Sequence, residues 1–212
     1  MNQHFGATAT NHNIYTLYIW RGFMKKSALI VLLALVFGAA NAEPTLILAR
    51  GVITNQSGPS NGTTSDSTAL KIMVGIRGNT SADILLVQSR NRSSLKNTLQ
   101  YELGLNQRFP VNRYLVTYLH PVIGSIQPSG VGSLNYVGIE PGVIVRPFAN
   151  AVSIKADYSW FAGINNTVQD VTMGRVALNY DLAKTTTVGL RKDWIRGDSR
   201  SETTWLTLNH RF

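Results

Sequence analysis

His120 is the histidine of this chain that could act as a general base, and its neighbours in the sequence decide what chemistry that would be. A serine hydrolase places a histidine beside a serine hydroxyl and a carboxylate. Ser125, Asp193 and Asp198 are the partners that an up-and-down path of the chain would bring toward the same end as His120. No G-x-S-x-G, H-E-x-x-H, G-x-G-x-x-G or G-x-x-x-x-G-K-[ST] motif supports a catalytic function. His120 precedes Pro121, so it more simply marks the end of regular strand pairing.

The absence of cysteine narrows the chemistry further. Thiolate catalysis, disulfide bonds, zinc ribbons and iron–sulfur clusters all need cysteine. We therefore expect a fold held by packing and hydrogen bonds alone. Since catalytic motifs are absent as well, we expect no enzyme, no cofactor and no metal.

Basic side chains form the more extensive pattern. The chain has 20 Lys and Arg against 11 Asp and Glu, a formal net charge of +9 and a mean hydropathy of −0.01. Such a charge suggests nucleic acid, but a nucleic-acid-binding protein exposes its basic residues as a stripe. Here they alternate with apolar residues and would point into a closed interior. We expect no nucleic-acid partner.

Alternation of apolar and polar residues predicts the elements that carry these charges. Alternation with period two indicates β-strands, and no segment after residue 42 has a helical period. The alternation is clearest in Ala69–Gly78, Thr98–Phe109 and Ala151–Gly163. Seven noisier segments complete a set of ten: Thr45–Thr54, Ile84–Ser93, Arg113–Gly124, Asn135–Pro147, Val171–Leu182, Thr186–Gly197 and Thr203–Phe212. The sequence thus predicts an all-β, up-and-down antiparallel β-barrel of about ten strands, with eight or twelve as the alternatives.

The N-terminal region has the composition of a targeting segment. From Met24, two lysines precede the apolar run Ala28–Phe37, and Ala40 and Ala42 occupy A-x-A cleavage positions. This is the order of a secretory signal peptide, and the run is shorter than the roughly 20 residues of a spanning helix. We predict a signal peptide at 24–42, cleavage near Ala42 and a barrel at 43–212. Residues 1–23 are interpreted as an upstream extension from a misplaced start.

The lengths of the loops and the positions of the aromatic residues distinguish a membrane barrel from a soluble barrel. The predicted connections after odd-numbered segments are long, as in Asn55–Thr68 and Ser125–Leu134, and those after even-numbered segments are shorter. Long loops at one end and short turns at the other are typical of outer-membrane barrels. Aromatic side chains gather near the two ends of the segments, which is typical of interfacial girdles. The predicted girdle contains Phe109, Tyr114, Tyr136, Trp160, Tyr180, Trp194 and Trp205. The alternation therefore predicts a barrel that spans a membrane.

The last segment carries the most specific motif. In TTWLTLNHRF, the residues Leu206, Leu208, His210 and Phe212 share one face, and the chain ends on Phe212. This segment resembles the C-terminal signature of Gram-negative outer-membrane β-barrel proteins, except that His210 stands where that family usually has an aromatic residue. The resemblance implies residence in the outer membrane and recognition by periplasmic chaperones and the barrel-assembly machinery. It also implies contact with outer-membrane lipid and lipopolysaccharide.

Charge assignment completes the sequence prediction. A Lys or Arg that faces lipid at mid-depth costs about 2–4 kcal/mol, so the polar face of each strand should point into the lumen. This rule predicts ten lumen-lining basic residues: Lys71, Arg77, Arg90, Arg92, Arg108, Arg146, Lys155, Arg175, Arg191 and Arg211. It predicts four acidic ones: Glu102, Glu140, Asp157 and Asp193. By the same alternation Lys192 alone would point toward lipid, and we expect it near the outer interface or beside a bulge.

These features favour an integral outer-membrane barrel with a narrow basic lumen. It would act as a small anion-preferring pore, with small anionic solutes as partners, or as a structural barrel whose lumen is filled by ion pairs. An adhesion or interaction barrel that acts through its extracellular loops is the alternative. An outer-membrane hydrolase built on His120 is the third possibility.

Overall fold

The computed structural model of the chain describes residues 44–56, 62–130, 132–147, 151–164, 170–197 and 200–212. All of them belong to the compact unit Ala42–Phe212. The predicted signal peptide and the upstream extension lie outside the described residues, and so does the expected cleavage site.

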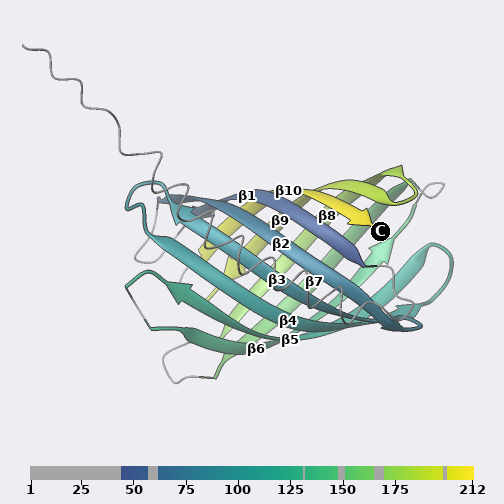
Figure 1. Cartoon of the computed structure of the whole chain (residues 1–212), viewed down its shortest axis with the longest axis horizontal. Coiled ribbons are helices and arrows are strands. Elements are labelled where there is room, and N and C mark those ends of the chain that lie inside the picture. Colours follow the sequence, from purple (N-terminus) through teal and green to yellow (C-terminus); the bar gives the residue numbers. More distant parts are fainter. Residues whose placement is uncertain (1–43, 57–61, 131, 148–150, 165–169, 198–199) are drawn as a thin grey trace, which may run out of the picture. The chain divides into compact units, whose positions relative to one another are not determined.

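Ten strands make up this unit, and each pairs antiparallel with its neighbours (Figure 1). The backbone N–H and C=O groups on both edges of a strand are paired only when the strand lies between two others, which closure of the sheet provides for all ten. The strands are β1 (Thr45–Asn55), β2 (Thr64–Arg77), β3 (Thr80–Asn91), β4 (Asn97–Pro110), β5 (Leu115–Pro128), β6 (Leu134–Val145), β7 (Val152–Gly163), β8 (Val171–Ala183), β9 (Thr186–Arg196) and β10 (Arg200–Arg211).

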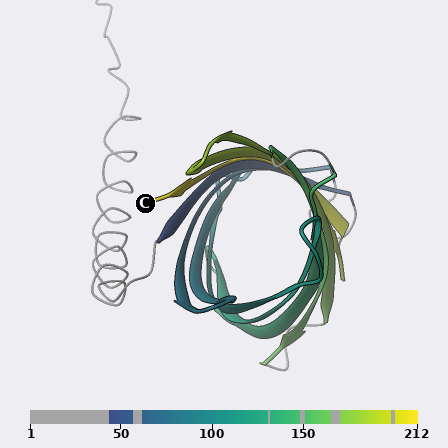
Figure 2. The same cartoon turned by 90° about the vertical axis from the view of Figure 1, so that its right-hand side faces the viewer.

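Pairing of the first and last strands closes the barrel. β1 and β10 run side by side from the pair Thr45 and Arg211 to the pair Asn55 and Ser201. Seen end-on, the strands form an oval ring (Figure 2). The start of β1 and the end of β10 lie at the end that carries the even-numbered connections, which we call the turn end; the other end is the loop end. The predicted all-β, ten-stranded, up-and-down barrel is confirmed.

Several strands reach further than the alternation predicts: β3 begins at Thr80 instead of Ile84, and β10 begins at Arg200 instead of Thr203. β2 begins at Thr64 instead of Ala69, and β5 continues to Pro128 instead of ending at Gly124. Serine and threonine between Thr64 and Thr68 read as turn residues in the sequence, but they pair with β1 and β3 here. The expected loops Asn55–Thr68 and Ser125–Leu134 are therefore shorter, at residues 56–63 and 129–133.

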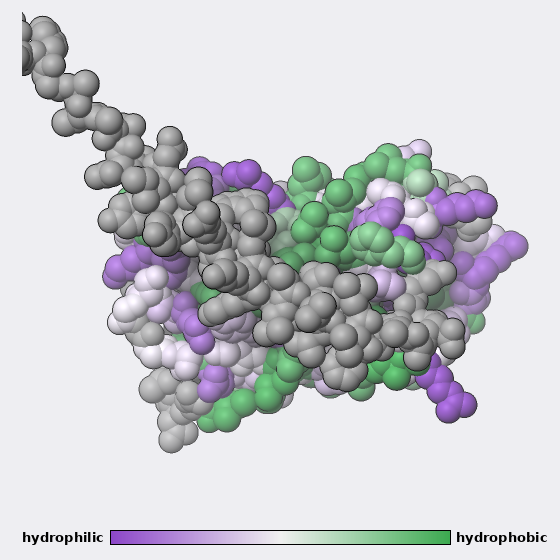
Figure 3. Space-filling model, in the orientation of Figure 1, coloured by the Kyte–Doolittle hydropathy of each residue, from purple (hydrophilic) through white to green (hydrophobic). Residues whose placement is uncertain are grey.

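The outer wall of the barrel is apolar along its middle. Leu103, Leu178 and Leu206 point outward and are 56%, 54% and 65% exposed. Hydrophobic residues gather near the middle of the face in Figure 3, and hydrophilic residues lie toward its two ends. A wall of this kind is energetically unfavourable in water and favourable in lipid. In the described ranges no helix is both long and apolar enough to cross a membrane.

Four of the predicted girdle aromatics occupy outward positions of strands, Tyr114 lies exposed in the turn between β4 and β5, and two point inward. Phe109, Tyr114, Trp160, Tyr180 and Trp194 are each 38–51% exposed. Tyr136 and Trp205 are only 6% and 5% exposed, because the register turns both into the barrel. Their assignment to the girdle is wrong: each has a polar atom that binds a carboxylate inside the barrel.

Candidate functional site

Arg175 is the centre of a charged network that crosses the interior of the barrel. The register places it between Asp157 of β7 and Asp193 of β9, all three on the inner face. Its guanidinium lies 3.2 Å from Asp157 Oδ1, 3.6 Å from Asp193 Oδ1 and 3.4 Å from Glu140 Oε1 of β6. One guanidinium has five N–H donors, so it can face three carboxylates at once.

His120 extends the network to the opposite wall. Its Nδ1 lies 2.6 Å from Glu140 Oε2, and its Nε2 lies 3.0 Å from Asp83 Oδ2 of β3. Lys71 Nζ of β2 lies 2.9 Å from Asp83 Oδ1. Because both ring nitrogens face carboxylate oxygens, the imidazolium form of His120 can donate on both sides. Charged groups thus connect β2 to β9 across the lumen.

Neutral donors supply further hydrogen bonds to the same carboxylates. The hydroxyl of Tyr118 donates to Asp157 Oδ2 at 2.7 Å, and the hydroxyl of Tyr136 donates to Glu102 Oε2 at 2.9 Å. The indole Nε1 of Trp205 donates to Asp193 Oδ2 at 2.9 Å, and the guanidinium of Arg191 stacks over the same indole. Buried carboxylates need several such partners to remain charged.

The network is closely packed, so that water does not reach the residues at its centre. His120 is 2% exposed and Ser159 is 0% exposed, so solvent does not reach them. Glycine provides the room for the rings, because a Cβ at Gly104 would run into the imidazole of His120, and one at Gly142 would run into the ring of Tyr118. A small apolar cluster of Ala49, Ala69 and Trp205 packs beside the network.

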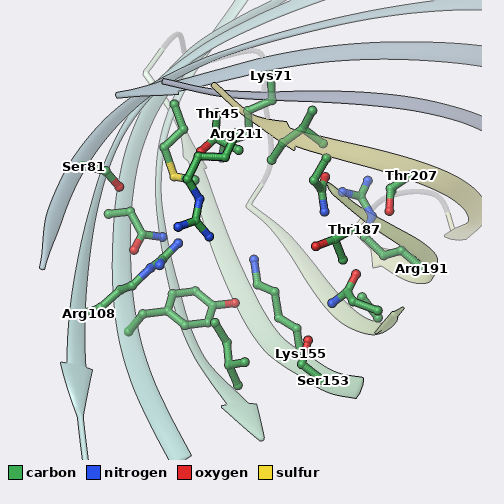
Figure 4. Close-up of a pocket in the computed structure, with 18 of the residues that line it drawn as sticks. Thr45, Lys71, Ser81, Arg108, Ser153, Lys155, Thr187, Arg191, Thr207 and Arg211 are labelled. Carbon is green, nitrogen blue, oxygen red and sulfur yellow. The ribbon is translucent and has the colours of Figure 1, made fainter. Parts of the chain in front are cut away.

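A cavity of about 650 Å³ lies between the network and the turn end. Turn residues Asn79 and Thr185 are among its lining, so the cavity reaches that end of the barrel. Figure 4 shows the side chains of Arg108, Lys155 and Arg211 pointing into it. Its lining has eight basic residues, Lys71, Arg108, Arg146, Lys155, Arg175, Lys184, Arg191 and Arg211, and three acidic ones, Glu102, Glu140 and Asp181.

Most of the residues predicted to face the lumen lie in this cavity or in the network. Asp157 and Asp193 point inward behind the cavity wall, where they hold Arg175. Lys192, the expected exception, points outward and forms an ion pair with Glu202.

Arg77, Arg90 and Arg92 do not line the cavity, which corrects their assignment. A bulge between Gly75 and Arg77 ends the regular alternation of β2, and Arg77 lies exposed beside the turn. On β3 the side chain of Asp83 points inward. Because side chains alternate along a strand, Arg90 points outward, and so does Arg92, which directly follows β3. Arg92 binds Asp66 there, with Nη2 2.7 Å from Oδ1.

Sequence analysis missed Asp83, Asp181, Lys184 and Tyr118. It named His120 only as a possible general base, and it placed Tyr136 and Trp205 in the girdle instead of the network. Asp83 directly precedes the predicted segment Ile84–Ser93 and was therefore assigned to the preceding turn, whereas the observed β3 begins at Thr80 and has Asp83 on its inner face. The pairing of β5 with β6 sets His120 opposite Glu140, and only a register could reveal this.

The hydrolase arrangement is not assembled. Ser125 lies on the outer face of β5 and His120 on its inner face, so the two side chains point in opposite directions. Asp198 lies outside the described residues. Within the described ranges, no group of three or more histidine or carboxylate side chains could hold a metal ion.

Comparison with known proteins adds a likeness in fold. No protein-family model and no curated protein matches the chain. An outer membrane channel from Pseudomonas putida F1 superposes with a TM-score of 0.57, at 10% identity over 81% of this chain and 96% of that one. The β domain of the Bordetella autotransporter BrkA gives a TM-score of 0.49 at 8% identity, over 81% and 99% of the two chains. The KdgM porin gives 0.43 at 10% identity, over the same shares. At such identities the likeness shows the fold alone, which is that of an outer-membrane β-barrel.

Proposed function

We propose that this protein is a narrow, anion-preferring pore of the outer membrane, and that the network around Arg175 controls passage through it. The observation that carries the proposal is the lining of the cavity, with eight basic and three acidic residues. A low-dielectric wall focuses the field of such a lining and raises the local concentration of anions.

The membrane location rests on the wall of the barrel. Outward leucine, valine and isoleucine side chains surround its middle, and exposed aromatics flank them. The Pseudomonas putida channel has the same fold, so the fold is compatible with conduction. In barrels of this kind short turns and both chain ends face the periplasm, which would open the cavity to that side.

The network gives the pore its closure. A solute that enters at the turn end meets Lys155 and Arg175 before it reaches the packed layer of His120 and Asp83. Passage requires the side chains of this layer to separate, and an arriving anion can compete with Glu140 or Asp157 for Arg175. The cavity would therefore select solutes by charge, and the network would set how often they pass.

A structural barrel is the second candidate, and a specific observation favours it. The side chains of Asp83 and Asp157 have no exposed surface, and separation of such a buried ion pair leaves a charge uncompensated, which opposes movement of the strands that carry it. In that case the same network would seal the lumen permanently. No described feature favours an adhesion barrel, because strand pairing takes up part of both loops that were expected to make contacts.

Planar-bilayer recording with the purified protein tests the proposal. Under a salt gradient the reversal potential should show anion preference. The double variant Arg108→Gln and Arg146→Gln should reduce that preference, because it removes two of the eight cavity charges. Arg113→Gln is the matched control, since Arg113 is an exposed residue of the turn between β4 and β5. Cation preference would refute the pore, and the absence of any conductance would favour the structural barrel.

A further inference from the structure

Charged residues on the outer wall of the barrel are confined to one half of its circumference. Apart from Arg77 at its bulge, the outward-facing charges of the described strands lie on β9, β10, β1, β2 and β3, which are contiguous in the closed barrel. Outward positions of β4 to β8 carry no Lys, Arg, Asp or Glu. These charges, with Arg92 next to the end of β3, form a group that we call the outer basic patch: Arg50, Asp66, Arg90, Arg92, Lys192, Arg196, Arg200 and Glu202.

The patch has an excess of positive charge, most of it toward the loop end, and its lowest member, Arg50, lies midway along β1 opposite Leu206. It contains six basic and two acidic residues. The two acids are already paired, Asp66 with Arg92 and Glu202 with Lys192. The described part of the chain shows no hydrogen bond or ion pair from the side chains of Arg50, Arg90 and Arg196, and all three are exposed. The charge of Arg50 acts on the nearby Asp66 without a hydrogen bond, so the donors of all three guanidinium groups can still bind an external anion.

Apolar side chains border the patch on the same strands. Leu48 and Leu206 lie next to Arg50 on the outer wall, 46% and 65% exposed, and Leu190 of β9 is 57% exposed. Trp194 points outward between Lys192 and Arg196 and is 38% exposed. A ligand that satisfies both regions has anionic groups at the loop end and hydrocarbon chains toward the middle of the barrel.

The spacing suits more than one anionic group. Arg50 on β1 is two strands away from Arg90 on β3 and two strands away from Lys192 on β9, about 10 Å across the sheet in each direction. Arginine binds phosphate in bidentate geometry and is weakly hydrated, which favours contact at the boundary with lipid.

We propose that the outer basic patch is a binding site for a phosphorylated lipid of the outer leaflet, held by Arg50 and Arg90 with its acyl chains against Leu48 and Leu206. The site depends on the membrane location and on a loop end that faces outward, but not on conduction through the lumen. Free phosphate would bind the same guanidinium groups, but it would gain nothing from the leucines. The patch shares the outer wall with exposed leucines that adjoin Arg50, which favours the lipid.

Native mass spectrometry of the purified protein in neutral detergent tests the site, with diphosphoryl lipid A as the probe. The wild-type protein should retain lipid A in preference to phosphatidylcholine. Each of Arg50→Gln and Arg90→Gln should weaken this retention about fivefold, the effect of roughly one basic residue at an anionic surface. Arg50→Lys should keep most of the binding, since it retains the charge.

Three controls separate the alternatives. Arg113→Gln, an exposed arginine at the turn end, should bind lipid A like the wild type. Equal retention by Arg50→Gln, Arg90→Gln and the wild type would overturn the site, and so would equal retention of phosphatidylcholine. Full competition by millimolar inorganic phosphate would show a site for free phosphate instead of lipid. Unaltered thermal unfolding of the variants would show that any loss of binding is local.

Discussion

At the scale of single residues, Arg175 neutralises a cluster that would otherwise be strongly repulsive. Asp157, Asp193 and Glu140 approach it from β7, β9 and β6, and its side chain is only 13% exposed. Removal of one partner from a buried ionic cluster leaves uncompensated charge in a medium that solvates it poorly. The arrangement thus depends on this guanidinium more than on any single carboxylate.

Arg175→Met should lower the free energy of unfolding by about 3–5 kcal/mol, the usual loss when one partner of a buried ion pair is removed. Denaturant unfolding in detergent, followed by tryptophan fluorescence, would measure it. Arg113→Met, which changes an exposed arginine, should leave stability nearly unchanged. A loss below about 1 kcal/mol for Arg175→Met, within the range of exposed ion pairs, would mean that the network is well hydrated.

Gly104 tests the packing of the network without removal of a charge. A Cβ at this position would run into the imidazole of His120 and the carboxylate of Asp83, so Gly104→Ala should displace His120 and lower the thermal unfolding temperature. Gly174→Ala is the control, because its Cβ would meet only Trp194 Cε3, at 4.0 Å. Equal unfolding temperatures for the two variants would argue against a tightly packed layer.

At the scale of elements, β10 combines closure of the barrel with the terminal motif. Its outer face carries Leu206, Leu208, His210 and Phe212, and the rings of the last two meet edge-to-face with centroids 4.8 Å apart. Thr186 Oγ1 lies 3.0 Å from His210 Nδ1, which ties the end of β10 to the start of β9. The end of the strand is thus ordered and accessible on the outer wall.

Deletion of Phe212 should reduce insertion into the outer membrane, because it removes an interfacial anchor and the terminal aromatic of the motif. His210→Tyr should leave insertion unchanged or improve it, since it brings the motif closer to the usual pattern. Quantification of the protein in outer-membrane fractions would check both. Normal levels without Phe212 would contradict recognition by the assembly machinery through this motif.

The strands show how far sequence reasoning reaches. Period-two alternation predicted all ten strands, because each has to present different faces to lipid and lumen. The same rule failed on β3, where Leu85 and Val87 face the lumen beside Ala49, Ala69 and Trp205. Midway along the barrel the interior includes apolar packing, and toward the loop end the outer wall carries charged residues such as Arg90. Polarity alone therefore could not assign Arg90, Asp83, Tyr136 or Trp205 to a face.

At the scale of the whole molecule, closure predicts resistance to detergent. Every strand has two hydrogen-bonded neighbours, so the described sheet has no free edge from which to unravel. The protein should migrate differently on SDS gels before and after boiling. Identical migration in the two lanes, for protein that was shown to be folded, would contradict a closed barrel.

The division of the lumen into a basic cavity and a packed network predicts that selectivity and conductance can be changed separately. Glu140→Gln combined with Arg175→Gln removes one buried charge pair and keeps a polar group at each position, while Asp157 keeps Tyr118 and Asp193 keeps Arg191 and Trp205. Its stability loss should therefore be smaller than the sum of the losses of the two single variants. Opening events in planar bilayers should become more frequent, because fewer ionic contacts hold the layer together. Anion preference should persist, since Arg108, Arg146 and Lys155 still line the cavity. Bilayer recording and unfolding of the wild type, the two single variants and the double variant would decide the role of the network. Unchanged opening with lowered stability would assign the network to structure. More frequent opening with unchanged anion preference would assign it to control of the pore.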